Sequence, residues 1–348
     1  MAKLTFVLPG DFRSGGVRVT VIMANLLRDR GHDVRIVTPK PPLFGRKALH
    51  SLWLKFRIAS NKNAGWLHEF KGPLVPFRRL DDLEYGKDEV VIAVGTYSVG
   101  HVRAMRKAVR KVRFNHGFPA APTPADIAAW RGKMPTITVS NTLVPRLQEE
   151  TEGSVWGVVP NGIDRKQYHI DPGVERIGLG ACFNPHPNKD PAILLRVLQD
   201  AAMELPDLPQ FMFSAEQKPA ELPHVNFTRL PSVDNARTIY NRCKIWLLTS
   251  RTEGLPGVVL EALACGCVVV SSDNDGSLEI LRHERESLIV PKGDAASFLA
   301  AIKRLHNDDT LRKQLAAEGQ RTIERFTWNA AADRMEAFIT WVSDRVKP

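Results

Sequence analysis

The sequence contains few cysteines and no long apolar run. There are four cysteines among 348 residues, and the two nearest, Cys265 and Cys267, are separated by a single residue. Zinc ligands do not use that spacing, so we expect buried thiols and neither a metal site nor disulfides. No stretch approaches the ~20 apolar residues of a membrane-spanning helix. The apolar N-terminal run ends at Pro9, too soon for a signal peptide, which predicts a cytoplasmic protein.

Composition is that of a globular protein, but the charge is unevenly distributed. Apolar residues make up 43% and charged residues 25% of the chain, whose length accommodates about two domains. The net charge is +10. Lys and Arg outnumber Asp and Glu by 25 to 12 in residues 1–150, whereas the remainder has 23 against 26. An anionic partner of the first half and a merely solvated basic surface both stay open.

Short β-branched runs alternate with helical periodicities, a pattern typical of parallel sheets with helices on both faces. In the first half we predict strands at Leu4–Leu8, Val34–Thr38, Val90–Val94, Val112–Asn115 and Thr136–Val139, and helices at Val17–Arg30 and, basic and amphipathic, His101–Lys111. In the second half we predict strands at Arg176–Ala181, Gln210–Ser214, Ile245–Thr249, Cys267–Ser271 and Ser287–Val290. The helices predicted there are Pro191–Ala202, Asp234–Arg242, Gly257–Cys265, Gly276–Arg282, Asp294–Leu305, Asp309–Phe326 and Trp328–Val346.

Two segments interrupt this alternation. Pro160–Gly173 carries turn signals and is interpreted as the junction between two α/β units. Residues 39–87 hold several prolines, with basic residues interleaved among aromatic ones. A long stretch with weak order signals is often a functional insertion.

Two loops carry the candidate chemistry. Gly15 and Gly16 follow the first predicted strand and open a helix, where backbone N–H groups can approach a phosphate. The run lacks the full dinucleotide fingerprint and the P-loop lysine, so an ordinary turn is an equal alternative. Glu253 follows a later strand at the end where open α/β sheets bind ligands, and Glu261 lies two turns into the next helix. With Gly254 nearby, this pair of carboxylates favours binding of hydroxyl groups over solvated acids.

The spacing of Glu253 and Glu261 resembles the Glu-x7-Glu motif of the retaining nucleotide-sugar glycosyltransferases of family 4, which have the GT-B fold. Further stretches agree in order: Gly15-Gly16, Gly31–Val34, Thr138–Ser140, Val159–Asp164, Gly276–Ile280 and Val290–Asp294. The resemblance covers nearly the whole chain and is most specific in residues 155–300. It implies an α/β protein with two Rossmann-like domains, at 1–162 and 163–327, facing a central cleft, and a C-terminal helix, 328–348, that crosses back to the first.

The resemblance also implies roles for individual residues. Glu261 would hold the ribose hydroxyls, Glu253 the hydroxyls of the transferred sugar, and Lys189 would neutralise the leaving diphosphate. The N–H groups of Gly254 and Leu255 would lie near sugar and phosphate. Gly15 and Gly16 would complete the diphosphate site, and His116 would lie near the anomeric centre. A fixed cation at the leaving group is the electrostatic contribution such sites need.

One position departs from the family. An arginine usually precedes the lysine by about five residues, and Asn184 stands there, so Arg251 or His186 is the candidate replacement. Asp273-Asn274-Asp275 resembles a metal-binding Asp-x-Asp only superficially; we interpret it as a loop with a helix cap. The GT-B resemblance implies no metal and no cofactor, with the nucleoside diphosphate sugar as co-substrate.

The acceptor is less specified than the donor. We expect a glycan or lipid-linked precursor, with peripheral contact to an anionic membrane. The candidate basic surface comprises Arg18, Arg103, Arg106, Lys107 and Arg110. A polyanionic acceptor such as modified DNA is the alternative. Two rivals from other classes remain: a non-catalytic sugar-nucleotide or glycan-binding protein, and a dinucleotide-dependent enzyme.

Overall fold

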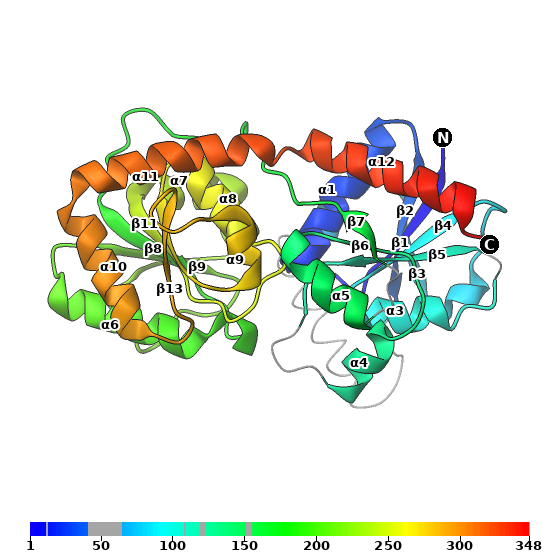
Figure 1. Ribbon diagram of the computed structural model, residues 1–348, viewed down its shortest axis with the longest axis horizontal. Coiled ribbons are helices and arrows are strands. Elements are labelled where there is room, and N and C mark those ends of the chain that lie inside the picture. Colours follow the sequence, from blue (N-terminus) through cyan, green and yellow to red (C-terminus); the bar gives the residue numbers. More distant parts are fainter. Residues whose placement is uncertain (12, 41–64, 108, 119–122, 151–154, 348) are drawn as a thin grey trace. The chain divides into compact units, whose positions relative to one another are not determined.

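The computed structural model describes residues 1–11, 13–40, 65–107, 109–118, 123–150 and 155–347. The chain divides into two compact units. The first comprises Met1–His116, Ala121–Pro160 and Asn329–Pro348, and the second comprises Gly117–Ala120 and Asn161–Trp328. The last helix therefore belongs to the first unit although it follows the second in sequence (Figure 1).

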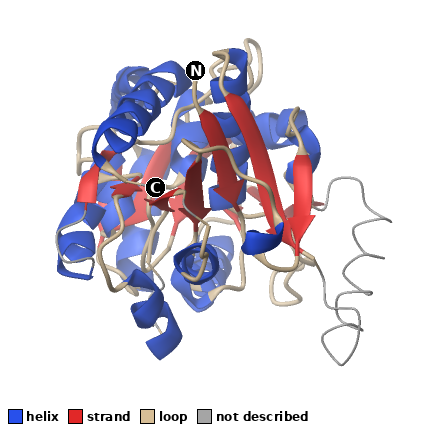
Figure 2. Cartoon of the chain, turned by 90° about the vertical axis from the view of Figure 1, so that its right-hand side faces the viewer, coloured by secondary structure: helices blue, strands red, loops and turns tan. Residues whose placement is uncertain are grey.

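The first unit is built on a seven-stranded parallel sheet. Its strands are β1 (Lys3–Val7), β2 (Asp33–Pro39), β3 (Leu74–Phe77), β4 (Val90–Val94), β5 (Arg110–Asn115), β6 (Thr136–Thr138) and β7 (Val155–Val158). They are ordered β3-β2-β1-β4-β5-β6-β7, so the direction of strand addition reverses between β1 and β4. Figure 2 shows strands with helices on either side, the arrangement that buries both faces of a parallel sheet.

Five helices and three short 3₁₀ turns accompany this sheet within the described residues. The helices are α1 (Gly15–Asp29), α3 (Thr96–Arg103), α4 (Pro124–Trp130), α5 (Val144–Glu150) and α12 (Trp328–Arg345), and the turns are η1 (Leu67–Glu69), η2 (Leu80–Asp82) and η3 (Asn141–Leu143). Charged contacts attach α12 to the unit. Arg30 at the end of α1 pairs with Glu336 at 2.5 Å, and His32 Nε2 lies 2.9 Å from the same carboxylate.

The second unit repeats the architecture with six parallel strands, in the order β10-β9-β8-β11-β12-β13. The strands are β8 (Gly178–Cys182), β9 (Gln210–Ser214), β10 (Asn226–Arg229), β11 (Cys243–Leu248), β12 (Val268–Ser272) and β13 (Ser287–Val290). The helices are α6 (Pro191–Glu204), α7 (Val233–Arg242), α8 (Gly257–Ala264), α9 (Asp275–Ile280), α10 (Ala295–Asn307) and α11 (Asp309–Thr322), with 3₁₀ turns η4 (Pro187–Lys189) and η5 (Ile323–Arg325). One continuous core joins the sheet to α6 and α10. Both units therefore have the predicted Rossmann-like α/β architecture.

Strands β4, β9 and β13 have the predicted bounds, and most other predicted elements shift by one to three residues. The prediction missed β3, β7, β10, α4 and α5, which are short. Part of the proline-rich segment 39–87 forms η1, β3 and η2, and residues 41–64 of it lie outside the described residues.

The predicted basic helix from His101 was wrong. Helix α3 ends at Arg103, and β5 begins at Arg110. Apolar residues from Val102 to Val112 repeat at helical intervals, but the chain turns after Arg103 and enters the sheet between β4 and β6. Tertiary pairing overrides the local periodicity here.

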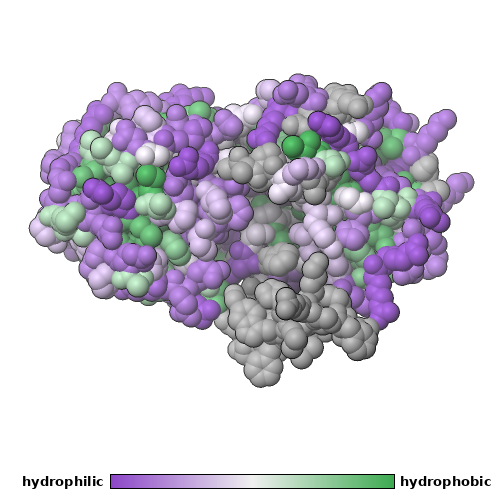
Figure 3. Space-filling model, turned by 90° about the horizontal axis from the view of Figure 1, so that it is seen from below, coloured by the Kyte–Doolittle hydropathy of each residue, from purple (hydrophilic) through white to green (hydrophobic). Residues whose placement is uncertain are grey.

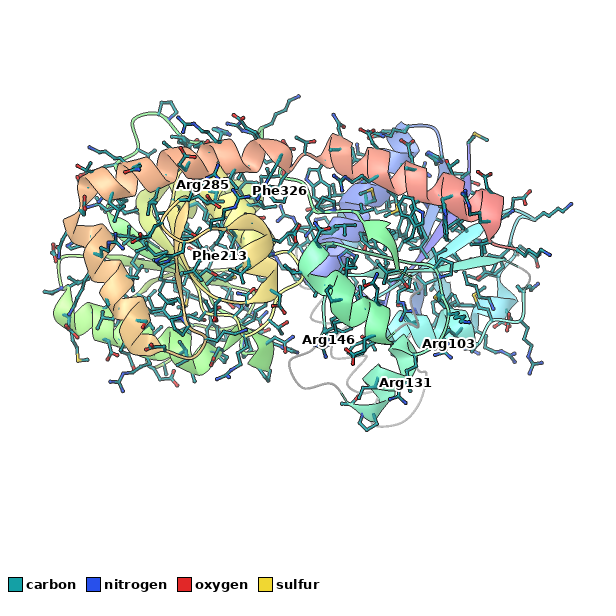
Figure 4. All side chains as sticks on the ribbon, viewed as in Figure 1. Arg103, Arg131, Arg146, Phe213, Arg285 and Phe326 are labelled. Carbon is teal, nitrogen blue, oxygen red and sulfur yellow. The ribbon has the colours of Figure 1, made fainter. Side chains whose placement is uncertain are left out.

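The basic residues of that segment consequently share no helical face. Arg103 donates to the carbonyls of Ala128 and Arg131, beside α4 (Figure 4). The backbone amides of Arg106 and Lys107 donate to Asp81. Arg110 is buried on β5.

Surface and thiol properties complete the fold. Among the described residues, no helix has the length and apolarity needed to cross a bilayer. The face in Figure 3 is mostly hydrophilic, with small scattered hydrophobic patches.

All four cysteines are described and form no disulfide. Cys243, Cys265 and Cys267 are buried as predicted, whereas Cys182 is only partly buried. Burial raises the pKa of the Cys267 thiol to about 12, so it is an inert packing group.

Candidate active site

The candidate site of the second unit lies where its strand order reverses. Strands β8 and β11 are neighbours, and the chain adds β9 and β10 on one side and β12 and β13 on the other. Segments 183–190 and 249–256 leave the carboxyl ends of these two neighbours. In open α/β sheets, ligands bind outside the carboxyl ends of strands at such a reversal. Lys189 and Glu253, predicted from sequence, lie one on each segment.

Hydrogen bonds join the two segments into one rigid platform. The amide of Arg251 donates to the carbonyl of Asn188 at 2.8 Å, and Thr249 Oγ1 donates to the carbonyl of Lys189 at 3.0 Å. Arg251 Nε also lies 2.8 Å from Asp190 Oδ2, an ion pair whose angles are not those of a hydrogen bond. These contacts hold the backbone on both sides of Lys189, which restricts where its side chain can point.

Lys189 and Glu253 form the charged centre of the platform. The Lys189 ammonium lies 2.5 Å from Glu253 Oε1, and the Ser250 hydroxyl donates to the same oxygen at 2.6 Å. The Glu253 side chain is 9% exposed and that of Lys189 is 36% exposed, so the carboxylate is set into the protein and the ammonium reaches solvent. An ammonium held by one carboxylate keeps two further N–H donors for an anionic ligand.

The backbone at the start of α9 packs closely against Glu253. A Cβ on Gly276 would lie 2.7 Å from the Cβ of Glu253, so only glycine allows this approach. Asn274 caps α9 by accepting from the amide of Ser277 at 2.9 Å, and its side-chain amide donates to Ser272 and Ser277. The interpretation of Asp273-Asn274-Asp275 as a loop with a helix cap is confirmed, with Asn274 as the capping residue.

Helix capping distinguishes the site from the rest of the second unit, of which residues 161–328 are all described. A side chain of the N-cap residue accepts from the first turn in α7, α9, α10 and α11. Helices α6 and α8 have no such bond; their N-caps are Asp190 and Pro256. These are the two helices that begin at the platform. The amides of their first turns carry partial positive charge, and no N-cap side chain bonds them.

Gly254 and Leu255 lie immediately before α8, and both are buried. The carbonyl of Leu255 accepts from the side-chain amide of Asn161 at 3.0 Å, which anchors this turn to the start of the second unit. Glu261, on the second turn of α8, is 6% exposed and accepts a hydrogen bond from the Tyr240 hydroxyl at 2.8 Å. Because this carboxylate is buried and bonded, its interpretation as a solvated surface acid does not hold.

In the first unit, a second group of predicted residues comes together. A Cβ on Gly16 would lie 3.6 Å from Cγ of His116, and the His116 ring packs on Phe114 at 4.1 Å between centroids. Part of the His116 residue is exposed, but its Nε2 is buried and has no hydrogen-bond partner. Burial lowers the pKa of His116 to about 3, which keeps the imidazole neutral at ordinary pH. Gly15 begins α1, which Ser14 caps.

The proposed replacements for the missing arginine differ in position. Arg251 belongs to the platform through Asp190. His186 Nδ1 accepts from the amide of Asn188 at 3.2 Å, and Asn184 Oδ1 accepts from the amide of His186 at 2.9 Å. His186 and Asn184 thus shape the turn before Lys189, and only Arg251 brings a second permanent cation to the platform.

The predicted basic surface does not form one cluster. Arg18 lies on α1, with its guanidinium carbon 5.0 Å from the centroid of the Trp66 ring. Arg110 pairs with Asp88 and donates to the carbonyls of Ser343 and Val346, so it fastens the chain's C-terminal segment.

Sequence reasoning missed Tyr240, Ser250 and Asp190. Ser250 acts through a local contact, three residues from Glu253, whereas Tyr240 and Asp190 meet their partners over a long sequence separation. For example, nothing in the sequence around Tyr240 indicates that its hydroxyl contacts the carboxylate of Glu261.

Comparisons with known proteins agree with this geometry. A family model described as "Glycosyl transferases group 1" matches residues 186–308, which include Lys189, Glu253 and Glu261. A phosphatidyl-myo-inositol mannosyltransferase from Mycobacterium leprae is 24% identical over 96% of this chain and 95% of its own length. The chain is a glycosyltransferase of the family 4 type. This glycosyltransferase also shares 33% identity with the lipopolysaccharide core biosynthesis glycosyltransferase LpsE of Rhizobium meliloti, over 29% of the chain and 30% of LpsE.

Solved structures show that the fold is GT-B. HepE from Anabaena, crystallised with UDP and glucose, has a TM-score of 0.74 at 15% identity, covering 98% of this chain and 100% of HepE. TarM has a TM-score of 0.73 at 10% identity, covering 97% of this chain and 99% of TarM. The enzyme is thus a two-domain GT-B glycosyltransferase.

Proposed function

We propose that the protein is a retaining glycosyltransferase that moves a sugar from a nucleoside diphosphate sugar to an acceptor hydroxyl without a metal ion. One observation carries the proposal. In the platform of the second unit, the Lys189 ammonium, just before α6, meets Glu253, just before α8, and both helices lack a capping side chain. That arrangement suits a diphosphate, because both the ammonium and the free amides favour negative charge. The structure of HepE with UDP and glucose supports the donor class.

The residues of the second unit then have distinct roles. As the bond between the anomeric carbon and the diphosphate oxygen breaks, its electron pair passes to that oxygen, and Lys189 stabilises the charge. The amides at the start of α8, with those of Gly254 and Leu255, act on the same group. Glu253 binds sugar hydroxyls and Glu261 binds ribose hydroxyls. The acceptor oxygen bonds to the anomeric carbon on the face that the diphosphate leaves, and its proton passes to the departing phosphate.

The first unit contributes to both substrates in this proposal. We assign Gly15 and Gly16 to the diphosphate of the donor, and neutral His116 to a hydrogen bond with the sugar or the acceptor hydroxyl, not to the role of a cation. A lipid-linked acceptor is supported by two relatives. One is named phosphatidyl-myo-inositol mannosyltransferase. The other, from Campylobacter jejuni, is a transferase whose printed substrate is a diphosphoundecaprenol-linked glycan, 24% identical over 40% of this chain. We therefore propose action at the cytoplasmic membrane as a peripheral protein.

The predicted helix His101–Lys111 was part of the basic surface offered for both acceptors, and it ends at Arg103, so that helix favours neither; the names of the two relatives favour the lipid-linked acceptor over DNA.

A thermal-shift screen tests the donor class first. UDP, GDP and dTDP sugars are compared with NAD, each with and without EDTA. We expect one nucleoside diphosphate sugar to raise the melting temperature, unchanged by EDTA, and NAD to leave it unchanged. Stabilisation by NAD alone, or by none of the diphosphates, overturns the donor assignment. Stabilisation that EDTA removes overturns metal independence.

Stereochemistry tests the reaction type. Lipid extracts and short-chain lipid-linked glycans serve as acceptors for the donor identified by the screen, and the anomeric configuration of the product is read by NMR. An α-linked product from an α-linked donor supports retention, and a β-linked product contradicts it. Transfer only to water-soluble acceptors contradicts the lipid assignment.

A further inference from the structure

Glu261 occupies an unusual position for a carboxylate. Its helix, α8, is otherwise apolar at the buried positions, which include Val259, Leu260, Ala262 and Leu263. Taking a carboxylate out of water is costly unless hydrogen bonds compensate it. The Tyr240 hydroxyl supplies one such bond, to Glu261 Oε2 at 2.8 Å, across the contact between α7 and α8.

Tyr240 is held rigidly. Its side chain is fully buried. The ring lies 4.3 Å from that of Trp246, 5.6 Å from that of Phe213 and 6.1 Å from that of Tyr168, the last two edge-on. Phe213 comes from β9, at the centre of the second unit in Figure 4. Contact with three aromatic rings in a buried setting restricts the Tyr240 ring, and this restricts the position of its hydroxyl oxygen.

In the hydrogen bond between these two side chains, Tyr240 is the donor and Glu261 is the acceptor. Burial, and then the nearby Glu261 carboxylate, raise the pKa of the Tyr240 phenol well above its usual value, so the phenol stays protonated and donates. A donated hydrogen bond stabilises the ionised carboxylate, the form that accepts hydrogen bonds from hydroxyl groups.

We propose that Tyr240 is a positioning residue for donor recognition, which orients the Glu261 carboxylate to bind the ribose hydroxyls of the nucleotide. This inference rests on the ribose role of Glu261 in the proposed function. Tyr240 itself is fully buried and acts only through Glu261. Its contribution is to binding and not to bond breaking.

The test compares a ribonucleotide with the same nucleotide lacking both ribose hydroxyls. Affinities for UDP and 2′,3′-dideoxy-UDP, or the corresponding pair for the nucleotide found in the screen, are measured by calorimetry. We expect Tyr240→Phe to weaken binding of the ribonucleotide about tenfold, as loss of a hydrogen bond to a charged group does. The affinity for the dideoxy analogue should not change. Steady-state kinetics should show a matching rise in donor KM with kcat nearly constant.

Glu261→Gln and Tyr85→Phe are measured in parallel. The Tyr85 hydroxyl donates to the carbonyl of Leu80 in the first unit, so Tyr85→Phe deletes the same atom away from the site and should change neither affinity. If Glu261→Gln retains the preference for the ribonucleotide, the ribose role of Glu261 is wrong and this inference fails with it. If Glu261→Gln abolishes the preference and Tyr240→Phe retains it, only the inference fails.

If Tyr240→Phe weakens binding of both nucleotides equally, Tyr240 has a packing role and the inference is overturned. If Tyr240→Phe does not fold, 3-fluorotyrosine at position 240 keeps the shape and changes the strength of the donor. The ribonucleotide preference should then shift while the melting temperature does not. An unchanged preference contradicts the proposal.

Discussion

The two units each place a loop and a helix at the reversal of their strand order, yet the two sites differ in what they offer a phosphate. In the first unit the glycine-rich loop leads into α1, whose first turn is capped by Ser14. In the second unit α6 and α8 begin without a capping side chain, and Lys189 lies immediately before the N-cap of α6. The first loop has more glycine, but the second has the free amides and the cation.

The comparison teaches that glycine content is a weak guide to phosphate binding. A capping oxygen occupies the amides that a phosphate would use, so a capped helix competes with its ligand. Absence of a cap costs stability, about 1 kcal/mol for each helix. Two such helices at one platform indicate stability given up for binding. The predictions below test whether the second unit alone carries the diphosphate.

The largest effect is expected at Lys189. Lys189→Ala removes the cation at the leaving group, and we expect kcat to fall by roughly 10²–10³ while the fold is retained. Release of nucleoside diphosphate measures the rate, and circular dichroism checks the fold. Lys303→Ala is the matched control, because Lys303 and Glu204 form another Lys–Glu ion pair, on the surface. Loss of activity below threefold in Lys189→Ala would remove Lys189 from the site.

Gly276→Ala should have the next largest effect. The added Cβ would meet the Glu253 Cβ at 2.7 Å and its backbone at 2.8 Å, so the loop bearing Glu253 must move. We expect a loss of about 1–3 kcal/mol in the free energy of unfolding, and a lower kcat/KM. Denaturant titration and kinetics measure the two.

Gly100→Ala in α3 is the control for Gly276→Ala, since nothing lies within 4 Å of its Cβ; this variant should be neutral or slightly stabilising. A Gly276→Ala enzyme with unchanged stability and activity would show that the packing of α9 does not set the position of Glu253.

The buried His116 of the first unit should make the free energy of unfolding decrease as the pH falls into the acid range. Burial lowers its pKa from 6.5 to about 3, so the unfolded chain binds a proton first as the pH falls. Its stabilising contribution is therefore complete above pH 6.5 and is lost between pH 6.5 and 3, at up to about 1.4 kcal/mol per pH unit. His116→Gln should flatten this pH dependence in urea titrations at several pH values. An identical slope in both proteins would exclude a buried neutral His116.

The smallest effect concerns the missing cap of α8. Pro256→Ser places a hydroxyl at the N-cap, whereas Pro256→Ala changes the ring without adding one. Relative to Pro256→Ala, we expect the serine variant to be more stable by about 1 kcal/mol and to bind nucleoside diphosphate less tightly. Thermal melts with and without the diphosphate measure both. Tighter binding in the serine variant would contradict competition between cap and phosphate.

Strong local patterns allowed most of the fold to be predicted. The bounds of β4 follow from a continuous apolar run, as a buried parallel strand needs, and β9 and β13 are short apolar runs with a polar residue at one or both ends. The segment after His101 was predicted as a helix, but part of it forms strand β5. Its helical spacing was real, but Arg110 and Arg113 enter the sheet and find partners that are distant in the sequence, including the carbonyls of Ser343 and Trp130.

The sequence by itself determined the two α/β units, the acidic pair on and before α8, and the lysine after β8, because each follows from local periodicity or from a motif of fixed spacing. Tertiary structure decided which of these residues meet. It paired Lys189 with Glu253 over 64 positions and Tyr240 with Glu261 over 21, and it brought the starts of two helices without a capping side chain, α6 and α8, to one reversal of strand order. Such juxtapositions depend on the order of strands in the sheet, which no local pattern encodes.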